Sequence, residues 1–131
     1  MKTETAQINL LLAWLWILLG FASGMVMGIF FHRENWLGGY ASFQRRMYRL
    51  GHISFFGLGG LNLMFCFTAR HFMLPGPMTQ IASLAFFTGA IAMPVCCAIM
   101  AGFPKATMIF SVPVVSLITG GVLVFWELIK L

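Results

Sequence analysis

Residues 8–31 read INLLLAWLWILLGFASGMVMGIFF, a stretch without a single Asp, Glu, Lys or Arg. Three more stretches of the same kind follow at residues 50–69, 79–103 and 106–126. Because an α-helix rises about 1.5 Å per residue, each stretch is long enough to cross the roughly 30 Å hydrocarbon core of a bilayer. The sequence therefore predicts an all-α integral membrane protein with four transmembrane helices.

The composition agrees with this class. Hydrophobic residues make up 60% of the chain and charged residues 8%, whereas soluble globular domains carry about 25% charge. The connections at residues 70–78 and 104–105 are short, and short links join antiparallel neighbours. We therefore expect a single membrane domain over residues 1–131, folded as an antiparallel up-down bundle.

The net charge of +5 indicates a topology and gives no reason to expect a nucleic-acid partner. Cationic residues gather in the cytoplasmic loops of membrane proteins. Placing residues 33–49 and 104–105 on that side leaves only Lys2, Arg70 and Lys130 on the other. This interpretation puts both termini outside, in the periplasm if the host is the bacterial inner membrane.

The segment 33–49 is not simply polar, because Trp36, Tyr40, Phe43 and Met47 recur at intervals of four, three and four. This helical spacing predicts a short interfacial helix over residues 42–49, after a break at Gly38 and Gly39. Its aromatic side chains would lie in the membrane surface, as aromatic belts do. The arginines would meet anionic lipids: Arg33, Arg45, Arg46 and Arg49.

Small residues mark the expected helix contacts. Gly20, Gly24 and Gly28 recur every four residues and so lie along one stripe, where a second helix can approach closely. On the second helix, His52, Gly59 and Cys66 share one face. An unpaired amide is costly in an apolar surrounding, so we expect Asn62 to hydrogen-bond to a neighbouring helix.

A cofactor site is the second hypothesis. His32 ends the first predicted helix and His52 begins the second, so a hairpin would bring both imidazoles to one membrane face. Haem b held by two helices needs two axial histidines, small residues beside the porphyrin and cations near the propionates. In this respect the chain resembles membrane-anchored b-type cytochromes. The resemblance implies His32 and His52 as ligands and Gly28, Gly59, Arg33, Arg45, Arg46 and Arg49 around the haem.

Two other features of the spans bear on chemistry. The vicinal pair Cys96 and Cys97 resembles the membrane cysteines of mercuric ion transport proteins, although the chain has no second cysteine pair and no CxxC motif. Pro94 and Pro113 each remove a backbone hydrogen bond, and we expect both helices to kink there.

Asp is absent from the chain and the three Glu residues lie outside the apolar stretches. No carboxylate pair is present for hydrolysis, and an autonomous enzyme is not expected.

The leading functional prediction is a non-catalytic accessory or structural subunit of a larger membrane complex, such as a respiratory or other energy-transducing one. Little of the chain extends outside the bilayer, and its small-residue faces favour association with other membrane subunits or with copies of itself. A haem b or quinone redox module that uses His32 and His52 is the alternative. A small homo-oligomeric transporter or channel is the second alternative, with Ser54, Asn62 and Thr119 along a shared pathway.

Overall fold

The computed structural model describes residues 2–74 and 76–131, with side chains from residue 7 onward, and this part of the chain is helical. Four long helices and two 3₁₀ turns follow one another: α1 (Lys2–Phe31), η1 (Trp36–Gly38), α2 (Phe43–His71), α3 (Pro77–Gly102), η2 (Thr107–Phe110) and α4 (Ser111–Ile129).

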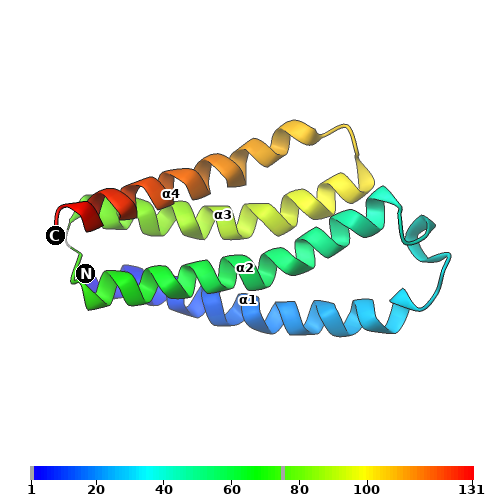
Figure 1. The fold of residues 1–131 in the computed structure, drawn as a ribbon, viewed down its shortest axis with the longest axis horizontal. Coiled ribbons are helices and arrows are strands. Elements are labelled where there is room, and N and C mark those ends of the chain that lie inside the picture. The colour runs from blue at the N-terminus through cyan, green and yellow to red at the C-terminus, as the bar shows by residue number, and fades with distance from the viewer. Residues whose placement is uncertain (1, 75) are drawn as a thin grey trace.

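The four helices are long and apolar enough to cross a membrane, which confirms the prediction of four such elements. Consecutive helices run in opposite directions, and the start of α1 and the end of α4 lie at the same end of the molecule (Figure 1). The opposite end carries the longest connection, which contains η1.

The separate short helix predicted over residues 42–49 is not present. Residues from Phe43 onward belong to α2, which continues without a break to His71. Ser42 is the N-cap, with an extended backbone and a hydroxyl oxygen that accepts from the Arg45 amide at 3.2 Å. A capped helix begins at its cap rather than at the edge of an apolar stretch, so the arginines occupy the first two turns of α2.

Backbone conformation defines the other connections. Leu37, Gly38 and Gly39 have φ of 52°, 80° and 96°, so the chain reverses between η1 and α2 through left-handed conformations. Gly76 has φ of 93° and precedes Pro77, the first residue of α3. Proline is favoured at that position because its missing N–H has no helical partner there.

Each helix packs mainly against its neighbours along the chain. Helix α2 packs along both α1 and α3, and α4 packs mainly along α3. Among the described residues, α1 and α4 share no extensive contact. The small-residue face of α4 is already used on α3, where a Cβ at Gly120 would lie 2.9 Å from the Phe86 ring.

The core lies between α1, α2 and α3. One cluster joins Leu12, Trp16, Leu58 and Ala90, and a second joins Phe65, Ala69, Ala82 and Phe86. Helix α4 reaches the second cluster through Leu117, Leu123 and Val124. Most of the remaining α4 surface is exposed, so this helix is held from one side.

Candidate functional site

His52 lies in the contact between α1 and α2. Its Nδ1 is 2.9 Å from Ser23 Oγ, and the Ser23 hydroxyl donates to the Gly20 carbonyl at 3.0 Å. The Ser23 hydroxyl thus links the Gly20 carbonyl to His52, and the donor in the Ser23–His52 hydrogen bond is set by the tautomer of the imidazole. The ring also contacts Phe56 edge-on, with centroids 5.5 Å apart.

The structure does not bring His32 and His52 together. The His52 ring lies over Gly24, where a Cβ would be 2.9 Å from Cε1. His32 is eight residues further along the chain, at the exposed end of α1. At about 1.5 Å per residue, the two histidines are separated by about 12 Å along the helix axis. The structure therefore places His32 about two helical turns beyond His52, towards the η1 end.

Arg45 is buried inside the hairpin, with 2% of its surface exposed. Its Nη2 donates to the carbonyls of Phe31 at 3.0 Å and Arg33 at 3.1 Å. The guanidinium also lies over the Phe31 ring at 4.9 Å and the Trp36 ring at 5.5 Å. Arg45 therefore caps the C-terminus of α1, where carbonyls lack helical partners and a cation is favourable. The sequence predicted this arginine beside anionic lipids or a haem, whereas in the structure its guanidinium is enclosed by groups of the hairpin itself.

The other three arginines of this segment lie at the surface or only partly below it. Arg33 lies over Phe30, Arg46 over Phe43 and Arg49 over Tyr40, at 5.5, 5.9 and 4.5 Å from the ring centres. Arg49 also donates to the Tyr40 carbonyl at 3.4 Å. Within the described residues, none of the three forms a salt bridge. Their positive charge is therefore available at the η1 end of the molecule.

Asn62 belongs to a buried polar cluster at the junction of three helices. The Asn9 amide donates to Asn62 Oδ1 at 2.7 Å and to the Ser83 carbonyl at 3.2 Å. The Ser83 hydroxyl donates back to Asn9 Oδ1. Asn62 itself donates to the Leu58 carbonyl at 2.9 Å. The sequence singled out Asn62 alone, since only the fold places Asn9 and Ser83 beside it.

The glycines predicted to mark helix contacts fall into two groups, those covered by the opposite helix and those with open space at the Cβ position. A Cβ at Gly20 would lie 2.8 Å from the Phe56 ring, and one at Gly59 would lie 3.1 Å from the Ala13 carbonyl. With Gly24, these two glycines lie where α1 and α2 are in close contact. At Gly28, no described atom lies within 4 Å of the Cβ position. The stripe predicted from the four-residue spacing therefore ends at Gly24, because α1 and α2 diverge towards η1.

Each of the two prolines lacks the N–H that would bond to the carbonyl four residues earlier, and a side chain from another helix donates a hydrogen bond to that carbonyl. Pro94 has no N–H for the carbonyl of Ala90, four residues earlier, and the Trp16 indole donates to that oxygen at 2.9 Å. Pro113 leaves the carbonyl of Ile109, and the Cys96 thiol donates to it at 3.4 Å. Pro113 lies in the first turn of α4, so the kink expected within this helix is replaced by a helix start.

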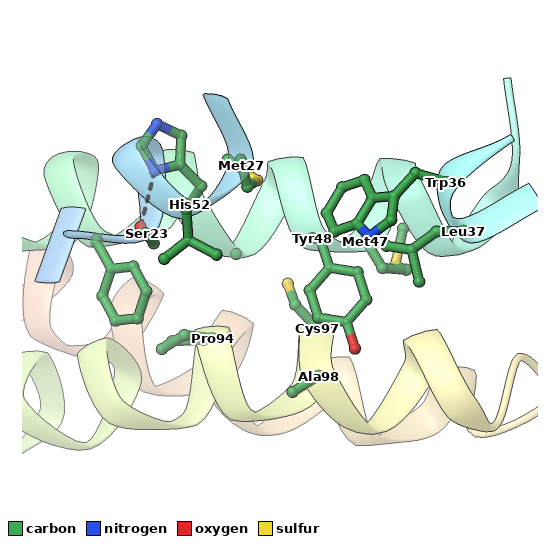
Figure 2. A pocket seen from close by; sticks show the side chains of 13 residues that line it. Ser23, Met27, Trp36, Leu37, Met47, Tyr48, His52, Pro94, Cys97 and Ala98 are labelled. Carbon is green, nitrogen blue, oxygen red and sulfur yellow. Dashed lines mark hydrogen bonds between the residues drawn. The ribbon is translucent and has the colours of Figure 1, made fainter. Parts of the chain in front are cut away.

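A pocket of about 550 Å³ lies beyond the Trp16 contact, towards η1. Its walls come from α1, η1, α2 and α3. Tyr48 and the Cys97 thiol point into the space between α2 and α3, whereas the His52 ring points back towards Ser23 (Figure 2). Sequence spacing gave no signal for this pocket, since its wall residues come from segments far apart in the chain.

The described residues hold no cluster of three or more His, Cys, Asp or Glu side chains able to bind a metal. Cys66, Cys96 and Cys97 are free, buried thiols. The polar residues considered for a pathway are dispersed: Ser54 and Asn62 are buried and bond to backbone carbonyls, whereas Thr119 lies on the exposed side of α4.

No protein-family model, curated protein or solved structure matches this chain.

Proposed function

We propose that this chain is an integral membrane subunit without catalytic activity of its own, which packs beside other membrane subunits in a larger complex such as a respiratory or other energy-transducing one. The observation that supports the proposal is the one-sided packing of α4. Its outward residues Val114, Ile118, Gly121 and Phe125 recur at intervals of four, three and four and are exposed. We call these four residues the outer face of α4.

Gly121 is the informative member of this face. No described atom lies within 4 Å of its Cβ position, and glycine inside a helix costs about 1 kcal/mol relative to alanine. Small residues on the outside of a membrane helix are typical of helix–helix interfaces, because they let two backbones approach. The neighbouring Gly120 already packs on Phe86, so Gly121 is free to receive a partner helix.

The test is purification of the tagged chain in mild detergent from its native membrane, followed by mass spectrometry of the accompanying proteins. Gly121→Leu should lose a stoichiometric partner that the unmodified chain retains. Thr119→Leu is the matched control, since it introduces the same side chain at an exposed α4 position that is not part of the outer face. Retention of the same partners by Gly121→Leu, or their absence from the unmodified chain, would contradict the proposal.

To distinguish a partner subunit from a second copy, the chain is co-expressed with two different tags, and co-purification of the two tagged forms would identify a second copy.

The redox alternative is tested separately by the absorption spectrum of the purified protein. A Soret band that disappears in His32→Ala or His52→Ala would favour a haem module over an accessory subunit.

The membrane orientation is a further part of this proposal. The cationic η1 end is placed in the cytoplasm by the positive-inside tendency, which puts both termini outside. A reporter that is active only in the periplasm should work when fused after Leu131 and fail when inserted at Gly39. The reverse pattern would invert the topology.

A further inference from the structure

The pocket beyond Trp16 has uncharged walls. With His52 neutral, none of the described residues that line the pocket carries a formal charge, and the His52 ring is bonded to Ser23. A charged occupant would find no counter-ion there, and burying an unpaired charge is costly. The pocket therefore suits a neutral molecule. Its volume of about 550 Å³ is within the range of small-molecule sites.

The wall of the pocket is rich in aromatic rings and sulfur atoms, contributed by Trp36, Tyr48, Phe55, Met27, Met47 and Cys97. These groups are polarisable and electron-rich, and they make favourable contacts with flat rings. A flat, neutral and electron-poor ring therefore complements this wall more closely than a saturated hydrocarbon chain does.

Trp36 brings to this wall a hydrogen-bond donor that is held in place. Its ring stacks on Phe30 with centroids 5.5 Å apart, meets Phe31 edge-on at 5.6 Å and lies beneath the Arg45 guanidinium. Its indole N–H makes no hydrogen bond within the part of the chain that the structure describes. The indole of Trp16, in contrast, already donates to a backbone carbonyl.

The Tyr48 hydroxyl is a second polar group of the pocket without a partner. It points into the space between α2 and α3 (Figure 2), and among the described residues it forms no hydrogen bond. Indole and phenol groups usually find a partner where water is excluded. An occupant with acceptor oxygens would supply a partner to both Trp36 and Tyr48.

We propose that this pocket binds the head group of a lipid-soluble quinone, whose carbonyl oxygens accept from the Trp36 indole N–H and the Tyr48 hydroxyl. The uncharged walls match the neutral ring, the aromatic and sulfur groups match its electron-poor π system, and the two donors match its carbonyls. The inference concerns binding and assigns no electron transfer to this chain. It goes beyond the accessory role and does not depend on it, because the pocket is formed within one chain.

The experiment is photolabelling of the full chain, purified in mild detergent, with a benzoquinone that carries an azido group on its ring and a decyl tail. The labelled residues are located by peptide mass spectrometry and should lie in the pocket wall, at Met47 or Cys97. Decylbenzoquinone without the azide should displace the probe. Decylbenzene has the same tail and no carbonyl oxygen, so it should need a concentration higher by about tenfold.

Variants test the two donors and the cavity separately. Trp36→Phe and Tyr48→Phe should each raise the probe concentration for half-labelling by about fivefold, because each loses one hydrogen bond and keeps a ring. Each should also reduce the preference for decylbenzoquinone over decylbenzene, which a purely structural effect would leave unchanged. Trp14→Phe, at an exposed position outside the pocket, is the control.

Ala98→Phe should fill the pocket and abolish most of the labelling. Ala22→Phe makes the same change at an exposed α1 position outside the pocket and should have no effect.

Equal displacement by decylbenzoquinone and decylbenzene, or wall labelling that persists in Ala98→Phe, would overturn the proposal. Unchanged labelling in both Trp36→Phe and Tyr48→Phe would also overturn it, because neither donor would then recognise the ring. If Ala98→Phe does not fold, these two variants still decide the outcome. A chain that binds the quinone but purifies without a partner would support this inference and contradict the accessory role, so the two proposals fail separately.

Discussion

At the scale of single residues, side chains from one helix satisfy carbonyls left unpaired in another. Trp16 donates to the Ala90 carbonyl freed by Pro94, and Cys96 donates to the Ile109 carbonyl freed by Pro113. Arg45 does the same for the end of α1. An unpaired carbonyl in an apolar surrounding costs several kcal/mol, so these contacts both stabilise the helices and fix how they pack.

Trp16→Phe should lower the free energy of unfolding by about 1–3 kcal/mol, because the Ala90 carbonyl loses its donor. The loss should be smaller in a Pro94→Ala background, since alanine restores an N–H to that carbonyl. Equilibrium unfolding in mixed micelles, followed by circular dichroism, measures all four members of the cycle. Trp14→Phe, at an exposed position, is the control. Equal losses in both backgrounds would assign the effect to packing alone.

Arg45→Met should cost about 1.5–3 kcal/mol, since charged donors to two carbonyls are removed from a buried position. Arg46→Met should be nearly neutral, because that side chain is exposed. Hydrogen exchange of the amides at 32–39 gives a second measurement and should accelerate only in the Arg45 variant. Similar behaviour of the two variants would mean that the cap contributes little.

At the scale of elements, the contact of α1 with α2 is set by ring-over-glycine packing. The Phe56 ring lies on Gly20 and the His52 ring on Gly24, whereas the backbone of α1 lies on Gly59. Beyond Gly24 the helices diverge, which leaves room for η1 and for the pocket. The glycine spacing on α1 alone does not show where this contact ends.

Gly24→Leu should destabilise the protein by about 1–3 kcal/mol, because the new side chain overlaps the His52 ring. Gly28→Leu should be neutral or stabilise by up to about 1 kcal/mol, since it replaces a poor helix former at an open position. Unfolding in mixed micelles compares the two variants directly. Equal destabilisation would show that the contact extends to Gly28.

At the scale of the whole molecule, α1, α2 and α3 pack around shared buried clusters, whereas α4 packs along α3 at one edge of the molecule. Helices α1, α2 and α3 share the buried Asn9–Asn62–Ser83 cluster and the first core cluster. Helix α4 joins through Gly89 and Gly120 of the α3–α4 contact and through part of the second cluster. The contact of α4 with α3 is as extensive as that of α1 with α2, but α4 has no comparable contact with a second helix among the described residues.

When the chain is divided within the connection at 103–106 and the two pieces are co-expressed, the α4 piece should co-purify with the remainder. Gly120→Leu should abolish this association, because its side chain overlaps the Phe86 ring. Gly121→Leu should preserve it, since that position faces outward. Loss of association in both variants would place Gly121 inside the α3–α4 contact.

Composition and hydrophobic length determined the class of this protein. The four apolar stretches became four long helices, and an even number of helices brings the first and last to the same end (Figure 1). These properties are local, since length and apolarity alone decide whether a segment forms a helix suited to a bilayer. The exact helix starts were not determined in this way, because caps such as Ser42 override the apolar boundary.

Only the tertiary structure decided which residues meet. It buried Arg45, separated His32 from His52, placed Asn9 and Ser83 beside Asn62, and formed a pocket lined by α1, η1, α2 and α3. Each of these depends on the approach of segments far apart in the chain. The spacing of residues within one helix fixes the face on which they lie, but the neighbour that covers this face is chosen by packing across the whole molecule.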